Sequence, residues 1–482
     1  MAFTIEPWAK KWLQEQRQKG TKCLEIKASN NKHYVYKSTT KYNPTTKKPQ
    51  KTSTYQGTLD PQKGYTPKQK NNNKKTTPKI TSIKETGTIR LLTKCATQIL
   101  TPLKESFPNN YEQLYALAIL RCINQTPLKR AATYWEKLEN IQQINPALSP
   151  KSLANMLQTT GADRDAQNKV FTKIDLDCAE LALDLSEFFS TSQTTSFAEK
   201  GYNKKHDNCP QINIVMAITK DSGTPVMVRP LPGSIRDVKT LCTTIKEMNR
   251  KDLTLIMDRG FFSEEKLGVL HSFGLKFLLP VKRNSLLYSR VVVEEYNVFV
   301  YHGRLIRFGK QGYGDYWLYR FKDESMATVE ERVVFMKFSE GVYSREQVEE
   351  KKGLFGQMLI VSSLDVGAEE VYLLYKRRDA VEKRFHTFKG VLDADVSYVR
   401  DNVSVFGHVF VSFLSMFIFA KLEDVIRRVG LLCKYSVEVV LVEYSKAYAV
   451  LTDDGFLDYE VPKKLELLDE KLGLNIFPIL RS

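Results

Sequence analysis

The sequence has little of what a zinc site or a disulfide framework needs. Its seven cysteines are scattered without a Cys-x-x-Cys pair, and its six histidines are equally dispersed. A cage of cysteine and histidine ligands is therefore not supported, and any bound metal has to be held by oxygen ligands. We interpret the cysteines as reduced, structural thiols.

Two further features are absent. No glycine-rich phosphate-binding loop occurs, so we expect no nucleotide cofactor. No charged-then-apolar signal opens the chain, and the longest apolar stretch, around residues 409–420, falls short of the roughly 20 residues that a bilayer span needs. These absences predict a cytoplasmic protein without a membrane partner.

Positive charge is concentrated near the N-terminal end. The net charge is +17, and residues 1–85 hold 19 Lys and Arg against 5 Asp and Glu. Such a concentrated positive patch attracts phosphate backbones through counterion release. A solvated basic tail without a specific partner is the alternative.

A chain of 482 residues is too long for one compact core and suggests two to four domains. We interpret residues 1–85 as a basic arm and linker, in which "HYVYKST" and "KTSTYQG" pair as a small β ribbon. Residues 86–170 have helical apolar spacing, and Ser149 before Pro150 forms a natural N-cap and first-turn pair. Helices beside a basic arm suit a DNA-binding region, although helices that only pack would look the same.

Strands alternating with helices follow in residues 171–280. Three strands, a helix, a strand, a second helix and a strand occur in that order, which is the order of an RNase H-like core. The segments are "LALDLSEFF", "INIVMAITK" and "TPVMVRPL", a helix over residues 237–249, "LTLIMD", "SEEKLGVLHSF" and "LKFLLPV". Residues 281–365 are interpreted as a β-rich insertion, residues 366–425 as the last part of the core, and residues 426–482 as a C-terminal helical region.

Two aspartates stand in or after apolar strands of this core. Asp258 directly follows an apolar run, which predicts a carboxylate at the C-terminal end of a buried strand, where α/β sheets bind ligands. Asp184 interrupts the first strand, and an acidic residue inside a core strand is costly without a partner or a cation. Asp258 as a turn or helix-cap residue, Asp184 on an edge strand facing water, and Asp175 or Asp177 in its place are the alternatives.

A long helix is expected from about Ala368 to Lys389. Tyr375, Arg378, Glu382 and Lys389 lie at offsets 0, 3, 7 and 14, so all four project from one stripe of that helix. An apolar row beside the stripe, consisting of Leu374, Val381, Phe385 and Phe388, predicts packing on the sheet. Glu382 can then reach over the sheet edge toward Asp184 and Asp258, although ordinary ion pairs within the helix would also explain Arg378 and Glu382.

This spacing of Tyr, Arg, Glu and Lys resembles the YREK signature of a large group of insertion-sequence DDE transposases. "IMDRGFF" and "LALDLSEFF" are similar to the segments that carry the two aspartates of that family, and "GYNKKHDNCPQINIVMAI", "PGSIRD" and "FGHVFVSFL" resemble the blocks that flank them. The likeness runs from the basic arm to the C-terminal end. The chain has Asp184-Leu185-Ser186 and Pro232-Gly233-Ser234 where the family usually has Asp-x-Thr and Pro-Gly-Asn.

The resemblance implies an α/β protein with an RNase H-like mixed sheet, flanking helices and a β-rich insertion, and an enzyme that cuts transposon ends and transfers strands. It implies that Asp184, Asp258 and Glu382 are the catalytic residues and hold two Mg²⁺ or Mn²⁺ ions, because in-line displacement at phosphorus suits two ions on carboxylates. Tyr375, Arg378 and Lys389 would contact the DNA backbone. Trp317 and Tyr319 in the insertion could stack on a flipped base, or be buried aromatics of a small sheet.

The implied partners are double-stranded DNA, as terminal inverted repeats and target, and a second copy of the chain. Two ends must be cut, yet the chain has one triad and no internal repeat, so we expect a homodimer on paired ends, in the nucleoid. Helical residues beyond Ser436 are the expected dimer surface. A transposase-derived DNA-binding protein that no longer cuts, or another RNase H-like nuclease, is the alternative.

Overall fold

In the computed structural model the chain forms two compact units, Met1–Lys79 and Ile80–Ser482. The structure describes residues 5–29, 32–43, 48–68, 79–124, 127–174, 180–189, 198–200, 210–219, 223–232, 242–243, 246–247, 254–257, 259, 262–376, 378–392, 401–453 and 457–477. The expected turn at Asp221 and Ser222 and nearly all of the expected helix over residues 237–249 lie outside them.

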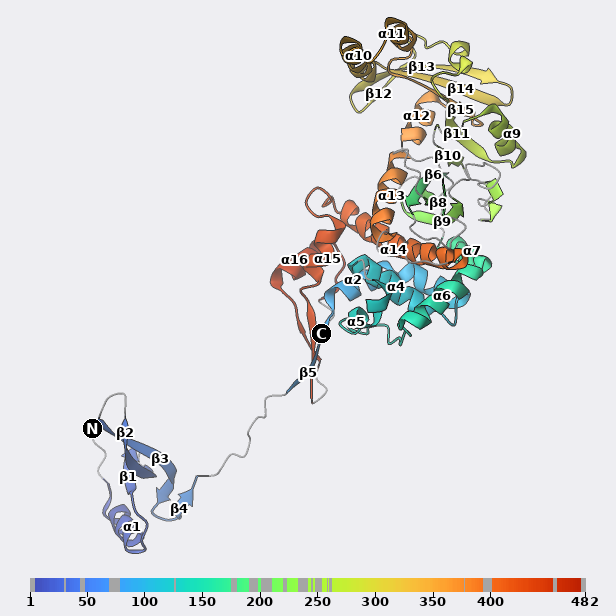
Figure 1. Cartoon of the computed structure of the whole chain (residues 1–482). Coiled ribbons are helices and arrows are strands. Elements are labelled where there is room, and N and C mark those ends of the chain that lie inside the picture. Colours follow the sequence, from blue (N-terminus) through green and yellow to red (C-terminus); the bar gives the residue numbers. More distant parts are fainter. Residues whose placement is uncertain are drawn as a thin grey trace. The chain divides into compact units, whose positions relative to one another are not determined.

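The first unit is a four-stranded antiparallel sheet with one helix, drawn in blue in Figure 1. The expected pairing of "HYVYKST" with "KTSTYQG" is confirmed, since Tyr36 lies opposite Tyr55. The helix and the two outer strands are additions that the sequence analysis did not anticipate. A small apolar core, Ala9, Ile26, Val35 and Leu59, holds the helix on the sheet. The elements are α1 (Pro7–Gln18), β1 (Leu24–Ser29), β2 (Lys32–Asn43), β3 (Lys48–Asp60) and β4 (Gly64–Pro67).

Helices form the first part of the second unit, as the apolar spacing predicts. Ser149 caps its helix as expected, because its hydroxyl accepts a hydrogen bond from the Ser152 amide at 3.2 Å. The helices pack around one long helix, α14 (Asn402–Arg428). This is the packing role that the sequence left open, and DNA binding by these helices stays a prediction. The elements are α2 (Gly87–Cys95), α3 (Thr97–Ser106), α4 (Tyr111–Ile123), η1 (Leu128–Arg130), α5 (Ala131–Trp135), α6 (Pro150–Ala162) and α7 (Arg164–Lys173).

The expectation that no apolar segment is long enough to span a bilayer is wrong for the central helix α14. Within the described residues it is long and apolar enough by length and composition, but 89% of its most apolar window is buried by the rest of the chain. Glycines allow its close contact with α6. A Cβ added to Gly407 would lie 2.1 Å from the Leu157 carbonyl oxygen, and one added to Gly161 would lie 1.9 Å from the Val403 carbonyl oxygen.

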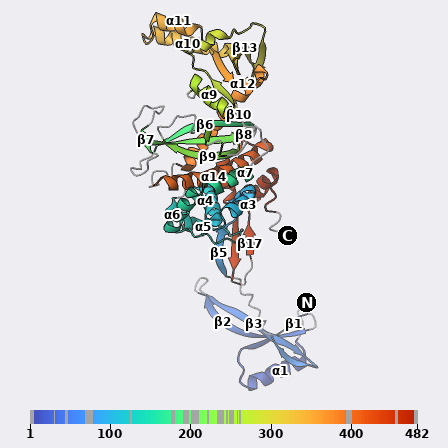
Figure 2. The ribbon, with the colours of Figure 1, turned by 90° about the vertical axis from the view of Figure 1, so that its right-hand side faces the viewer.

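The sheet of the second unit has ten strands in the order β12-β13-β14-β15-β11-β10-β6-β8-β7, with β9 also paired to β8. The strands predicted in the core are present. They are β6 (Glu180–Phe189), β8 (Pro210–Thr219), β9 (Pro225–Pro232), β10 (Thr254–Ile256) and β11 (Lys276–Pro280), with α9 (Glu264–Ser272) between the last two, and β7 (Glu199–Lys200) is additional. The fold is therefore mixed α/β. Figures 1 and 2 both show α14 between β9 and the helices α4 and α6, and contacts of α14 with each of these elements agree.

The stretch expected to be a β-rich insertion also contains two helices, α10 (Glu324–Ser339) and α11 (Arg345–Lys352). Its strands are not a separate sheet, because β15 pairs with β11 of the core. Both helices begin with capping side chains: the Asp323 carboxylate accepts from the Met326 amide, and Ser344 forms a capping box with Gln347. The remaining elements are η3 (Leu286–Arg290), β12 (Val298–Tyr301), β13 (Arg304–Tyr313), β14 (Tyr316–Asp323) and β15 (Gln357–Ser362).

The C-terminal region combines helices with a strand pair. β5 (Ile80–Glu85) pairs with β16 (Tyr448–Thr452), and β16 pairs with β17 (Leu457–Glu460), so residues 80–85 lie in the second unit. The helices are α15 (Val437–Tyr444) and α16 (Lys463–Lys471). The helical spacing of residues 426–482 did not predict these strands.

Candidate active site

Asp184 lies on a central strand of the large sheet. β6 has β10 on one side and β8 on the other, and Asp184 is opposite Met216 of β8. Met216 and its neighbour Val215 are fully buried. The alternative of an edge strand is therefore wrong, because both sides of β6 are paired.

Asp258 lies outside the described residues, as do the rival candidates Asp175 and Asp177. The strand that precedes Asp258 is described, and β10 is parallel to β6 with Ile256 opposite Ala182. β10 is buried, and the Met257 amide donates to the Leu278 carbonyl oxygen of β11 at 3.1 Å. In the sequence, Asp258 follows Ile256 by the same number of residues as Asp184 follows Ala182.

The four residues of the predicted stripe lie on the helical segments on either side of residue 377, so the expected single helix is not tested at that residue. Tyr375 is on α12 (Ala368–Lys376), and Arg378, Glu382 and Lys389 are on α13 (Arg378–Leu392), while residue 377 lies outside the described part. The Arg378 side chain joins the two helices, since its guanidinium lies 5.7 Å from the centre of the Tyr375 ring. The structure thus brings Tyr375, Arg378 and Glu382 together.

Glu382 is held by a neighbour on its own helix. Arg378 Nη2 donates to Glu382 Oε1 at 2.8 Å, with 16% of the Arg378 side chain and 52% of the Glu382 side chain exposed. An exposed pair of this kind contributes only about 0.2–1 kcal/mol of stability. The Glu382 carboxylate is therefore accessible to a competing cation.

The face of α13 next to Glu382 is anchored in the core. Phe385 and Phe388 are buried, as is Leu374 of α12, which confirms these members of the predicted apolar row. α13 contacts β6, β8 and α14. The helix that carries Glu382 therefore packs directly on the strand that carries Asp184.

Arg384 is a buried anchor of α13 that sequence reasoning missed. It is buried, its Nε donates to the Gly223 carbonyl oxygen at 2.6 Å, and its guanidinium forms an ion pair with Glu423 of α14. These contacts tie α13 to the end of the β8–β9 connection and to the central helix. The only signal in the sequence is an arginine within an apolar helix face, two residues after Glu382.

The aromatic residues of the insertion are part of its packing. Tyr319 is fully buried, and its hydroxyl donates to the Leu364 and Val366 carbonyl oxygens at 2.9 and 3.0 Å. This bears out the alternative of a buried aromatic and excludes Tyr319 as an exposed base-stacking residue. Trp317 is half-buried, with Lys310 Nζ 4.4 Å from its ring centre.

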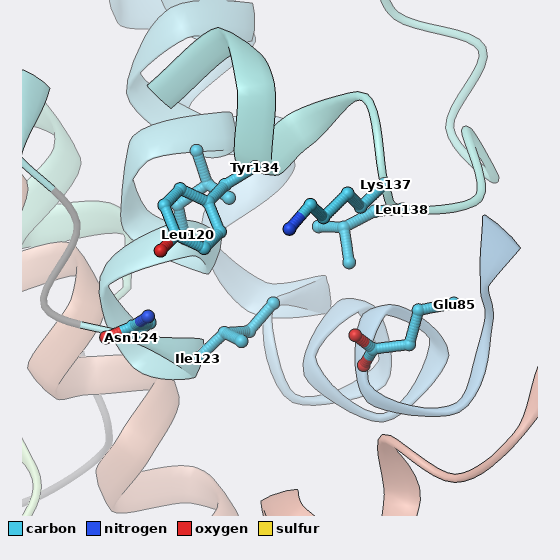
Figure 3. Close-up of a pocket in the computed structure, with 7 residues that line it drawn as sticks. All are labelled: Glu85, Leu120, Ile123, Asn124, Tyr134, Lys137 and Leu138. Atoms are coloured by element: carbon cyan, nitrogen blue, oxygen red, sulfur yellow. The ribbon is translucent and has the colours of Figure 1, made fainter. Parts of the chain in front are cut away.

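The described side chains contain no group of three His, Cys, Asp or Glu that could hold a metal. Asp258 and the side chain of Asp184 are not among them. A small cavity elsewhere, of about 40 Å³, lies beside α4 and is lined by Glu85, Leu120, Ile123, Asn124, Tyr134, Lys137 and Leu138 (Figure 3). It has room for water only. Burial raises the pKa of Glu85 in its wall.

Comparisons with known proteins give a family match and a similar solved structure. Residues 182–418 match the family model of the transposase DDE domain. No curated protein matches the chain. The chain is also similar to a cryo-EM structure of piggyBac transposase in a synaptic complex with hairpin DNA, with a TM-score of 0.36 and 11% identity over 74% of this chain and 79% of that one.

Residues 182–418 therefore belong to the transposase DDE domain family. Asp184, Asp258, Glu382 and the core of the sheet all fall inside the matched range. Transposases of this family generally use divalent metal ions.

Proposed function

We propose that this protein is a DNA transposase of an insertion sequence, which cleaves the ends of its element and joins them to target DNA. The observation that carries the proposal is the parallel pairing of Ile256 with Ala182. Continued by two residues along both strands, it would set Asp258 beside Asp184, because parallel strands keep equivalent positions side by side. Asp184, Asp258 and Glu382 are then the catalytic carboxylates.

The strand order supports an RNase H-like core. β9, β8 and β6 are antiparallel neighbours, and β10 and β11 continue the sheet in parallel on the other side of β6. The insertion leaves the core after β11 and returns to it through α12 and α13. The two aspartate strands are thus adjacent at the centre of the sheet, with the Glu382 helix packed on one of them.

The donor set fits hard divalent cations. Three carboxylates offer only oxygen ligands and leave coordination positions for water and substrate, which suits Mg²⁺ or Mn²⁺. Asp184, Asp258 and Glu382 would hold two such ions. When bound, the ions would activate the oxygen that attacks phosphorus and stabilise the oxygen that leaves it.

The neighbouring side chains bind and orient the DNA. Arg378 is suited to a phosphate near the scissile bond, since its planar guanidinium already lies beside Glu382. Tyr375 supports Arg378 from α12, and Lys389, three turns further along α13, adds a point charge. Arg384 keeps α13 in place on the sheet.

The substrate is double-stranded DNA, as terminal inverted repeats and as target, in the cytoplasm and nucleoid. The +14 charge of residues 1–79, with 18 Lys and Arg against 4 Asp and Glu, supports this partner. A homodimer would supply one triad for each of two paired ends. Exposed Val439 and Val442 of α15 make the region beyond Ser436 the proposed dimer surface.

The test is a cleavage and strand-transfer assay with purified protein and duplexes copied from both flanks of its gene. We expect nicking and joining with Mg²⁺ or Mn²⁺, no requirement for a nucleotide, and no reaction in EDTA. Binding without cleavage in either metal would favour the alternative of a DNA-binding protein that has lost its activity. Cleavage of any branched duplex regardless of sequence would favour another RNase H-like nuclease.

A further inference from the structure

The first unit contains a protruding two-stranded ribbon, defined as residues 37–43 of β2 and 48–54 of β3. The two strands pair from Lys37 opposite Thr54 to Asn43 opposite Lys48. The pairing of β1 ends at Lys37, and β4 pairs with β3 only from Gly57 to Asp60. Within the described part of this unit, no third strand pairs with the ribbon beyond Lys37 and Thr54, apart from one bond from the Ser38 amide to the Cys23 carbonyl oxygen at 2.7 Å.

Nothing apolar holds this ribbon against the rest of its unit. Its side chains are Lys, Thr, Ser, Gln, Pro and Asn, with Tyr42 as the one large aromatic, 66% exposed. The core residues Ile26, Val35 and Leu59 all lie outside it. An isolated polar hairpin is at best marginally stable in water. A long pair of strands with such polar side chains is better explained as a surface that contacts a partner molecule.

The two faces of the ribbon differ. On one face the Ser38 hydroxyl donates to Glu25 at 2.6 Å, and Lys51 forms an ion pair with the same carboxylate at 2.7 Å. The other face, which we call the lysine face, contains no acidic residue. Directly paired residues share a face. The lysine face therefore carries Lys37, Thr39, Lys41, Lys48, Gln50, Thr52 and Thr54, all exposed.

The lysines of this face have no acidic partner within the described part of the chain. Lys37, Lys41 and Lys48 make no ion pair there; Thr39 lies between Lys37 and Lys41, and Thr54 lies opposite Lys37. Lysines suit phosphates, and threonine and glutamine side chains can hydrogen-bond base edges. The major groove of B-DNA is wide enough to admit a two-stranded β ribbon.

We propose that the ribbon inserts into the major groove of duplex DNA and reads part of the element's end. Its lysine face would point into the groove, with Lys37, Lys41 and Lys48 on the phosphates and Thr39 and Thr52 near the base edges. The inference rests on the proposed function for its substrate but not on the cutting chemistry. The ribbon is a recognition element, and the carboxylates of the second unit are not part of it.

Charge-matched variants of the full-length protein test the phosphate contacts. The ribbon variant carries Lys37→Gln, Lys41→Gln and Lys48→Gln, and the control variant carries Lys19→Gln, Lys22→Gln and Lys63→Gln, three exposed lysines of the same unit outside the ribbon. Binding to duplexes from the gene's flanks is measured in EDTA at several salt concentrations. We expect a loss of about tenfold or more in the ribbon variant and a salt slope flatter by about 2–3, since each phosphate contact contributes about 0.9. Equal losses in both variants, or no loss in the ribbon variant, would overturn the proposal.

A variant with a shortened ribbon tests whether the ribbon enters the major groove. Replacing residues 38–53 by Asn-Gly joins Lys37 to Thr54 through a two-residue turn and leaves the apolar core intact. Methylation of guanine N7, which lies in the major groove, should interfere with binding of the wild type and no longer with the shortened protein. Unchanged interference, or tighter binding of the wild type to single-stranded DNA or duplex RNA than to duplex DNA, would contradict the proposal.

These outcomes separate the two proposals. If the wild type binds duplex DNA through the ribbon but never cuts it, only the proposed catalytic function fails. If the wild type cuts and the ribbon variants bind and cut unchanged, only the ribbon proposal fails.

Discussion

Arg378 and Glu382 are joined across one turn of α13, where Arg378 Nη2 donates to Glu382 Oε1 at 2.8 Å. The proposed mechanism assigns the carboxylate to metal ions and the guanidinium to a phosphate. In the DNA-free protein the guanidinium and the carboxylate therefore form an ion pair with each other. Binding of metal and DNA would exchange this ion pair for two new contacts.

Arg378→Ala should separate metal binding from DNA processing. Without the competing guanidinium, Mn²⁺ should bind with up to about fivefold higher affinity, because an exposed pair contributes at most about 1 kcal/mol. Cleavage at saturating Mn²⁺ should fall about tenfold or more, since a phosphate contact is lost. Electron paramagnetic resonance of free Mn²⁺ and a cleavage time course measure the two effects. A variant with weaker Mn²⁺ binding and wild-type cleavage would contradict both assignments.

Arg384→Met should destabilise the core of the second unit. The substitution removes the bond to the Gly223 carbonyl oxygen and leaves Glu423 without this partner, at a cost of about 2–4 kcal/mol. The exposed neighbour Lys383→Met is the matched control, with an expected change within about 0.5 kcal/mol. Urea unfolding followed by circular dichroism gives both values.

A second measurement distinguishes a positioning role of Arg384 from a purely structural one. In the double variant Arg384→Met with Glu423→Gln, part of the stability should return because the carboxylate that lost Arg384 and keeps only the 3.5 Å ion pair with Arg427 is replaced by a neutral amide. Cleavage should stay low, since α13 has lost an anchor next to Glu382. Recovery of cleavage together with stability would reduce Arg384 to a purely structural residue.

The sequence predicted the core strands because each is a distinct apolar run with a turn signal beside it. The pairing of Ile256 with Ala182 was not visible, because periodicity gives the faces of a strand but not its neighbours. Arg384 was missed for a similar reason, since Gly223 is 161 residues away in the sequence. The candidate positions Glu382 and Arg378 were predicted from their spacing on a helix, which is a local property.

The helices α10 and α11 show where local reasoning failed. α10 has no buried residue in the structure, and valine, methionine and phenylalanine are spread over its exposed surface. An amphipathic stripe was therefore absent, and the β-branched and aromatic residues favoured a strand. The capping residues Asp323 and Ser344 were the available signals.

Because His408 is buried, we expect the protein to lose stability in mild acid. It is fully buried in α14, its Nδ1 lies 3.1 Å from Arg121 Nη2, and burial together with that cation lowers its pKa well below the usual value. The folded state keeps the ring neutral while the unfolded state protonates near pH 6.5, so stability is present above that pH and falls below it. We expect a loss of up to about 1.4 kcal/mol per pH unit from this group between pH 6.5 and 5.

The measurement is urea unfolding as a function of pH for the wild type and His408→Gln. The variant cannot take up this proton, so its stability should change less between pH 7 and pH 5. A wild type and a variant with the same pH dependence would show that His408 is not the titrating group.

The dimer proposal predicts that Val442→Asp weakens assembly on paired ends. Val442 is 60% exposed on α15, and a charge there would oppose burial against a second copy. Leu286→Asp, at an 87% exposed position in the insertion, is the control. Light scattering of each protein with end DNA measures the mass of the complex. A wild-type complex that cleaves both ends with one chain would rule out the dimer.

The central claim is that the Glu382 carboxylate acts in cleavage, and the most direct measurement compares Glu382→Gln with Asp379→Asn. Both substitutions remove one negative charge from exposed positions of α13, one turn apart. The account predicts that Glu382→Gln binds end DNA normally but cleaves at least about a hundredfold more slowly, equivalent to about 2.7 kcal/mol. Asp379→Asn should cleave at the wild-type rate. Equal cleavage by the two variants would contradict the assignment of Glu382 to the active site.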